Sequence, residues 1–148
     1  MNRNARSSIV LALVNKLKSI DGTGNFNNNL FSNVYPLLKF WDEVSDFPSV
    51  YVTSGVEHRE YLPSNFKWGH LTVAIKVYVK GETPAVALES VISDIEYILD
   101  NNNVLTYNTN VAGSATADIQ IVSIVTDEGL LVPYGVAEIT LKVQYQVM

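Results

Sequence analysis

The end of the chain alternates between apolar and polar residues without interruption. The apolar positions are Ala137, Ile139, Leu141, Val143, Tyr145 and Val147. Because side chains two residues apart on a strand share a face, this pattern predicts a β-strand with one face in the core and one facing water or a partner. The strand is longer than the usual length of about 5–6 residues. Its polar outer face favours a sheet against which another protein docks.

The segment before this strand has the composition of a hairpin turn. Residues 127–129 (Asp-Glu-Gly) and 133–135 (Pro-Tyr-Gly) are turn formers, and residues 117–126 predict the partner strand. Within that partner strand, Val122 and Ile124 are apolar on the otherwise polar side. This slip predicts a β-bulge, or burial of both faces of the strand.

Further strands are predicted in the middle of the chain. Residues 66–80 alternate, and their apolar face consists of Leu71, Val73, Ile75, Val77 and Val79. Residues 47–55 predict a strand that Gly55 ends, and residues 56–62 predict its hairpin partner. Residues 63–65 (Pro-Ser-Asn) then predict the turn into the second alternating strand.

Residues 84–99 have the periodicity of an amphipathic helix. The apolar stripe consists of Leu88, Val91, Ile92, Ile95, Ile98 and Leu99. The residues expected on the solvent side are Glu89, Asp94 and Glu96. Thr83 is expected as the N-cap, and residues 101–103 (three Asn) as a left-handed C-cap.

The first third of the chain predicts a helix followed by a loop. Residues 5–20 have helical periodicity, with a buried side formed by Ile9, Leu13 and Leu17. Residues 21–33 are rich in Gly and Asn and predict an irregular loop. The apolar residues in this loop, which need cover from the domain or from a neighbour, are Phe26, Leu30 and Phe31. Residues 34–46 are ambiguous, because their helical spacing extends over a short segment only.

Together these elements predict an α+β fold, a two-layer sandwich in which two helices pack on one face of a mainly antiparallel sheet. Strand 71–79, helix 84–99 and strand 117–126 are expected to form one right-handed crossover. At 148 residues, the chain (1–148) is expected to form a single domain with a substantial core.

Composition narrows the classes of function. A net charge of −5 argues against a phosphate-binding patch over the whole domain. The absence of cysteine excludes disulfides, thiolate metal sites and a cysteine nucleophile. The longest apolar run, residues 9–14, is far shorter than the ~20 residues that cross a bilayer, so we predict no membrane partner.

Residues that carry chemistry do not form a recognisable catalytic pattern. His58 and His70 lack a third ligand at a spacing that suits zinc. Neighbouring acidic residues are expected to be solvated turns, and no serine has the glycine spacing of a nucleophile elbow. We therefore predict that the chain is not an enzyme and has no catalytic residue, metal site or cofactor.

Several segments resemble one family in the family's own order. Residues 125–139 (Val-Thr-Asp-Glu-Gly-Leu-Leu-Val-Pro-Tyr-Gly-Val-Ala-Glu-Ile) and the strand after them resemble the C-terminal region of tail terminator proteins from tailed bacteriophages. Residues 47–52 (Phe-Pro-Ser-Val-Tyr-Val), followed by 55–57 (Gly-Val-Glu), are similar to the family's central segment. Residues 71–99 resemble its strand–helix unit. The resemblance covers most of the chain from about residue 47 onward.

The resemblance implies a structural function without catalytic residues. Such proteins form a six-fold ring on the finished head-proximal end of the tail tube, at the tail–neck junction of the virion, after assembly in the host cytoplasm. The implied partners are other copies of the chain, the tail tube protein and the head–neck connector protein, with a sheath protein where the tail is contractile. DNA passes through the ring without specific binding.

Two sets of residues are candidates for these contacts. The loop residues Phe26, Leu30 and Phe31 are expected to contact an adjacent subunit or the tube. A negative lumen repels DNA phosphates, so some of a set of acidic residues are expected to face the channel. This acidic set consists of Asp42, Glu43, Asp46, Asp127 and Glu128.

Two alternative functions are compatible with the same pattern. The first is a neck or head-completion ring protein, which is also a small α+β ring former. The second is a small non-viral α+β ligand-binding domain, with a polar pocket between helix 84–99 and the sheet.

Overall fold

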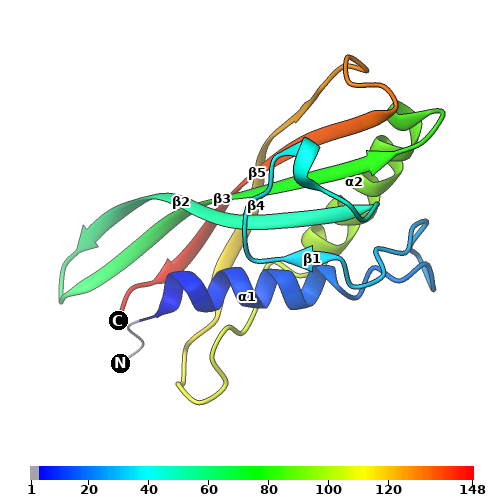
Figure 1. Cartoon of the computed structure of the whole chain (residues 1–148). Helices are drawn as coiled ribbons and strands as arrows, with labels where there is room; N and C mark the ends of the chain where they lie inside the picture. Colours follow the sequence, from blue (N-terminus) through cyan, green and yellow to red (C-terminus); the bar gives the residue numbers. More distant parts are fainter. Residues whose placement is uncertain (1–3) are drawn as a thin grey trace.

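The computed structural model describes residues 4–148 as a five-stranded sheet with two α-helices (Figure 1). In chain order the elements are α1 (Ala5–Leu17), β1 (Val34–Tyr35), the 3₁₀ helix η1 (Trp41–Glu43), β2 (Ser49–Leu62), β3 (Phe66–Lys80), α2 (Pro84–Asp100), β4 (Thr116–Thr126) and β5 (Tyr134–Gln146). The strand order is β1-β2-β3-β5-β4. The predicted α+β class is confirmed.

The sheet is antiparallel at every pairing except the short one between β1 and β2. Strands β3 and β4 both run antiparallel to β5, so they run parallel to each other with β5 between them. Helix α2 makes the connection from β3 to β4 across this intervening strand. The expected strand–helix–strand crossover is therefore present.

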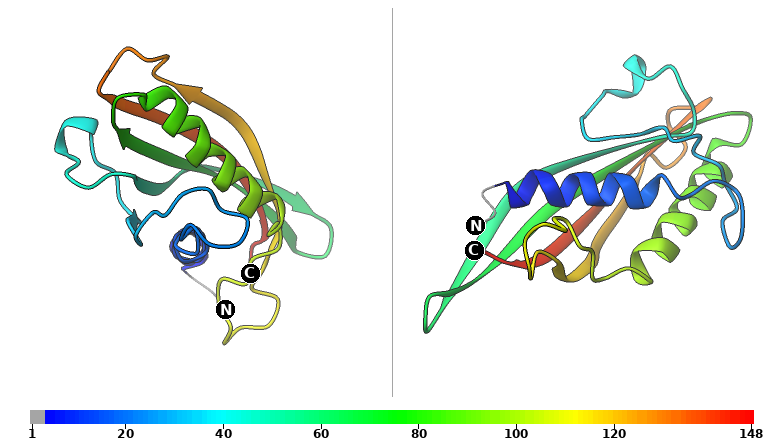
Figure 2. Two further views of the ribbon diagram at one scale, coloured as in Figure 1. Left: turned by 90° about the vertical axis from the view of Figure 1, so that its right-hand side faces the viewer. Right: turned by 90° about the horizontal axis from the view of Figure 1, so that it is seen from below.

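Both helices contribute to one core against the same face of the sheet. Alternate residues of β3 and β5 point into this core, as Leu71 and Ile139 do, together with Leu13 of α1 and Ile95 of α2, and all four side chains are fully buried. The right-hand view of Figure 2 shows both helices in front of the sheet. Each such burial contributes about 1.5–3 kcal/mol, which is why the alternating strands have a unique register.

The prediction that residues 56–62 form a separate hairpin partner is wrong. They continue β2, a single strand of 14 residues that pairs with β3 along its whole length. The pairing shifts between Ser54 and Glu57, so Gly55 lies in a β-bulge and does not end the strand. The chain reverses at residues 63–65 instead, where Ser64 and Asn65 adopt positive φ angles.

The far end of this hairpin forms an arm, which we define as residues 57–70. Figure 1 shows its tip projecting past the rest of the chain. Strand β5 pairs with β3 only as far as Trp68, so the tip lies beyond the last strand pairing with the body of the sheet. Several arm side chains are exposed, including Tyr61 and Leu62.

Strand β4 contains the predicted bulge. Its pairing with β5 shifts between Ile121 and Ser123, which leaves Val122 as the extra residue. Beyond the shift, Ile124 lies opposite Ile139 and therefore returns to the core-facing side. Of the two explanations for the slip in alternation, the bulge is confirmed.

The ambiguous segment 34–46 is mostly irregular and covers one end of the helix-free face. Val44 packs there with Tyr51 of β2 and Tyr78 of β3 in a small second cluster. The Tyr78 hydroxyl donates a hydrogen bond to the Lys39 carbonyl, which ties the segment to the sheet. The helix-free face is therefore covered by chain at this end.

The expected left-handed C-cap of α2 is wrong. Asn101 has φ −94°, and the side-chain amides of Asn101 and Asn102 donate to the carbonyls of Tyr97 (2.8 Å) and Ile98 (2.7 Å). The last carbonyls of a helix need hydrogen-bond donors, which a left-handed cap normally provides through backbone amides. Here the two Asn side chains donate to these carbonyls instead. At the other end Thr83 is the N-cap residue, although its side chain makes no capping hydrogen bond. In the described part of the chain, no helix is long and apolar enough to cross a membrane.

Candidate functional site

The five acidic residues of the predicted channel set gather at one end of the sheet. The ring of Tyr134, at the start of β5, lies 5.4 Å from the Trp41 ring and 5.7 Å from the Phe47 ring, measured between centroids. These contacts join the segment that carries Asp42, Glu43 and Asp46 to the β4–β5 turn that carries Asp127 and Glu128. All of the five are exposed except Asp127, which is partly buried and accepts a hydrogen bond from the Leu131 amide.

Exposed apolar side chains lie among these carboxylates. They are Leu37, Leu38, Phe40, Trp41, Leu130 and Val132, and Leu130 is 84% exposed. We call residues 37–46 and 127–132 together the acidic end. A surface that combines exposed apolar groups with a polar rim is typical of a protein contact, so this end is a candidate docking surface.

The three predicted interface residues in loop 21–33 have different environments. Leu30 is fully buried in the core of its own chain. Phe26 packs edge-on against Tyr97 of α2, with ring centroids 5.9 Å apart. Phe31 is 66% exposed. The domain itself therefore covers two of the three residues, and Phe31 is the one presented at the surface.

Asp94 fixes this loop, and the prediction that it faces solvent is wrong. Its side chain is 2% exposed, and its carboxylate accepts hydrogen bonds from the backbone amides of Asn27 (3.0 Å) and Asn28 (2.9 Å) and from the Asn28 side-chain amide (2.9 Å). Buried polar groups need such partners. Position 94 lies three residues after Val91 and four before Ile98, within the buried stripe, and this spacing was the signal available in the sequence.

A second cluster of polar groups lies at the base of the arm. The Glu57 side chain is 5% exposed, its Oε1 accepts a hydrogen bond from the Tyr145 hydroxyl (2.5 Å), and its Oε2 pairs with Arg59 Nε (2.8 Å). The Arg6 guanidinium of α1 donates to the Gly55 carbonyl at the bulge. The Glu57 contact with Tyr145 fastens the arm to β5, and the Arg6 contact fastens the bulge at the base of the arm to α1.

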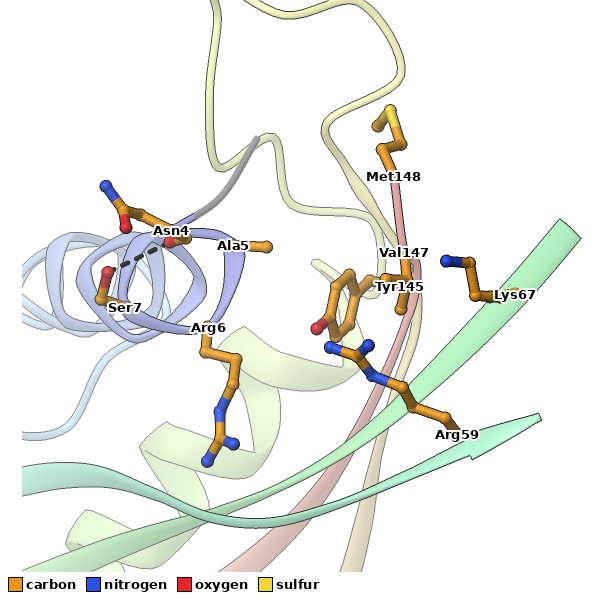
Figure 3. Close-up of a pocket in the computed structure, with 9 residues that line it drawn as sticks. All are labelled: Asn4, Ala5, Arg6, Ser7, Arg59, Lys67, Tyr145, Val147 and Met148. Carbon is orange, nitrogen blue, oxygen red and sulfur yellow. Dashed lines mark hydrogen bonds between the residues drawn. The ribbon is translucent and has the colours of Figure 1, made fainter. Parts of the chain in front are cut away.

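A cavity of about 460 Å³ opens beside this cluster, lined among others by Arg6, Arg59, Lys67 and Tyr145. Figure 3 shows the Arg59 guanidinium next to the Tyr145 ring, with the Lys67 ammonium on the same side of the cavity. Burial raises the pKa of Glu57. The hydrogen bonds from Tyr145 and Arg59 together lower it by more than burial raises it, so the pKa lies below its usual value. Burial, and then the hydrogen bond to Glu57, raise the pKa of Tyr145.

The depressed pKa of Glu57 predicts a specific loss of stability in acid. A carboxylate whose pKa is lower in the folded state stabilises the fold above its unfolded pKa, and this contribution is lost as pH falls through the folded pKa. Glu57→Gln should therefore be less stable than wild type at pH 7 and should lose less stability between pH 7 and pH 3. Urea unfolding at each pH measures both quantities.

Glu89→Gln is the matched control for this prediction, because Glu89 is an exposed carboxylate on α2, away from the arm. It should follow the wild-type pH dependence. If Glu57→Gln lost as much stability in acid as wild type does, the ionised Glu57 would not be a stabilising partner of Tyr145 and Arg59.

The two histidines face each other across the arm. His58 and His70 are paired between β2 and β3, and His70 Nε2 lies 3.5 Å from the Glu60 carboxylate. Among residues 4–148 no group of three His, Cys, Asp or Glu side chains has the arrangement of a metal site.

A similar fold is found in a solved structure of a gene transfer agent particle. A chain in the virion of a native gene transfer agent particle superimposes with a TM-score of 0.62 over 99% of this chain and 100% of that one, at 12% sequence identity. At this identity the similarity concerns the fold alone.

Sequence comparison defines the family. Residues 3–148 match the family described as Bacteriophage Tail Tube Terminator Protein, and the chain belongs to this family of structural phage tail proteins. It is 38% identical over 150 residues to the tail tube terminator protein p142 of Escherichia phage T5, with 95% of this chain and 93% of the relative covered. The resemblance stated from the sequence is therefore confirmed.

Proposed function

We propose that six copies of this chain form a ring at the head-proximal end of the tail tube. The ring stops polymerisation of the tube protein and offers the surface to which the head–neck connector attaches. The observation that carries this proposal is the similarity to the phage T5 tail tube terminator over nearly the full length of both chains. The ring lies at the tail–neck junction of the virion and assembles in the host cytoplasm. In a contractile tail, a sheath protein is a further partner.

The two ends of the molecule differ enough to bind two different partners. The acidic end and the tip of the arm lie at opposite ends of β3, whose 15 residues span about 45 Å. The acidic end exposes carboxylates and large apolar groups, and the arm exposes Tyr61 and Leu62 near Arg59 and Lys67. Such a polarised protomer is suited to a tube on one side and a connector on the other.

We place part of the acidic set toward the channel. Asp42, Glu43 and Asp46 belong to the segment that packs on the helix-free face through Val44, and Tyr134 holds this segment beside Asp127. Carboxylates around a lumen repel phosphate and let DNA pass without specific binding. Of the loop residues, Phe31 supplies the contact with an adjacent subunit or the tube, while Phe26 and Leu30 hold the loop in position.

A neck or head-completion ring is the second candidate function. Such a protein would bind purified heads in a pull-down and leave purified tubes in solution, whereas a tail terminator would bind the tubes. The ligand-binding alternative has less support, because the space between α2 and the sheet is filled by side chains such as Leu88, Ile95 and Ile139, each at most 1% exposed.

Electron microscopy of polymerising tube protein tests the proposed function. Adding the chain during polymerisation should arrest elongation and give tubes with extra density at one end only, because a bound ring covers the surface that the next tube subunit needs. Tubes of unchanged length with bare ends would contradict the proposal. An equal concentration of bovine serum albumin is the control for nonspecific arrest.

A further inference from the structure

We propose that neighbouring copies join edge to edge, with the open edge of β4 in one copy adding to the open edge of β2 in the next. This inference rests on the proposed ring and names the surfaces that close it.

Strand β4 is an edge strand whose outer side has no strand partner within the described residues. Within residues 4–148 it pairs only with β5, and on the other side only its first residues are tied: the Thr116 amide donates to the Leu105 carbonyl (2.9 Å), and the Asp118 carboxylate accepts from the Asn103 side chain (3.2 Å). Residues 119–126 contain no charged side chain. Val122 and Val125 are each 62% exposed. Free strands in monomers are usually protected by charges, proline or a cover, so an uncharged apolar edge of this length indicates a contact with another chain.

The opposite side of the sheet offers a second open edge, on β2. Strand β1 pairs only with Val50 and Tyr51, and the chain then leaves the sheet at Pro36. From Thr53 onward, the outer side of β2 has no strand partner within the described residues, and it is open up to the bulge, where the Gly55 carbonyl accepts from Arg6 of α1.

A groove of about 420 Å³ runs along this part of β2, lined by Val10 and Leu11 of α1, Pro36 and Val52–Ser54. Leu11 is 50% exposed. An edge beside an apolar groove is the arrangement that accepts an added strand, because main-chain hydrogen bonds form along the edge while alternate side chains enter the groove. Ile121 and Ile124 lie opposite Leu141 and Ile139 on the helix side of β4 and are side chains of suitable chemistry for this groove, whereas Val125, opposite Glu138, lies beside the contact on the helix-free side. Further along β2, the charged run Glu57–Glu60 protects the arm, so the contact is confined to the part near the groove.

The directions of the strands favour a second copy of this chain as the occupant. The long strands alternate in direction across the sheet in the order β2, β3, β5, β4, so β4 runs antiparallel to β2. A copy related by rotation about an axis along the strands keeps these directions. Its β4 therefore meets β2 in the antiparallel sense, like the long-strand pairs inside the sheet. Two different edges of one protomer make a head-to-tail contact, which can close into a ring, whereas β4 against β4 would stop at a two-fold dimer.

Cross-linking between single cysteines tests this contact, because the natural chain contains no cysteine. Val125→Cys and Thr53→Cys proteins are mixed on tail tubes and treated with a short bismaleimide. A cross-linked dimer is expected in the mixture and in neither protein alone, and a chain with both substitutions should give a ladder of products up to six. Thr53→Cys mixed with Val86→Cys is the control, since Val86 is 70% exposed on α2 and belongs to neither edge.

Charge at the edge supplies a second measurement. Val125→Lys should abolish capping of tubes while its thermal unfolding stays that of wild type, and Val86→Lys should cap normally. Capping by Val125→Lys, or dimers of Val125→Cys alone, would overturn the edge-to-edge contact and leave the proposed function intact. Failure of the wild-type chain to cap tubes would instead overturn the proposed function, so the two failures are distinguishable.

Discussion

Asp94→Ala is expected to lower the free energy of unfolding by about 2–4 kcal/mol, because three hydrogen-bond donors around the Asn27–Asn28 backbone lose a shared buried acceptor. The higher helix propensity of alanine offsets less than about 1 kcal/mol of this loss. Urea unfolding measures the change as a shift of the midpoint. Hydrogen exchange at the amides of Asn27 and Asn28 should accelerate as well, because the loop loses its anchor.

Glu89→Ala is the matched control, since Glu89 is an exposed carboxylate on the same helix. Its effect should stay within about 0.5 kcal/mol, the usual range for surface substitutions. Equal free energies of unfolding for the two variants would contradict this prediction. They would mean that water replaces the Asp94 carboxylate without loss of stability and that packing of Phe26 and Leu30 holds loop 21–33.

Gly135→Ala is expected to destabilise the fold by about 1–3 kcal/mol, as overpacking of a close contact does. A Cβ atom at this position would lie 2.7 Å from Val79 Cγ2 and 3.2 Å from the carbonyl oxygen of Pro84. The Pro84 carbonyl is backbone at the start of α2, so relief of the contact requires the helix to shift away from the sheet. For a chain of this size, calorimetry should show a fall in Tm of several degrees.

Gly81→Ala serves as the control for Gly135→Ala. A Cβ atom at Gly81 has no neighbour within 4 Å, and the residue does not have a positive φ angle. Its Tm should therefore match that of wild type or exceed it slightly. An unchanged Tm for Gly135→Ala would mean that α2 and β5 separate easily.

The long strands could be predicted because one face of each is buried. In β3 and β5 the alternation of apolar residues continues along nearly the whole strand, and the structure follows it. The distal part of β2 has no such alternation, because the arm lies outside the core and its side chains are mostly exposed. In the sequence, Gly55 therefore indicates the end of a strand, whereas in the structure pairing with β3 accommodates it in a bulge.

The candidate site was only partly predictable for a related reason. The sequence identified the acidic residues but could not place Asp42 and Asp127 at one end, since their proximity depends on contacts of Tyr134 with aromatic residues more than 80 positions away. The charge of Asp94 predicts the solvent side, whereas its position in the apolar stripe indicates the core, and the structure follows its position. The two open edges depend on which strands end up outermost, and that order follows from the complete topology.

The location of both helices on one face of the sheet gives the protomer a taper. One side consists of sheet plus helices, while much of the other side is a single sheet surface with segment 36–47 at one end. Wedges of this kind, placed side by side, curve toward their thinner side, so the direction of bending is built into each subunit before any partner binds. In the proposed ring, this bending would make the helices the outer wall and would turn Asp42 and Glu43 toward the axis, as proposed above for the acidic set.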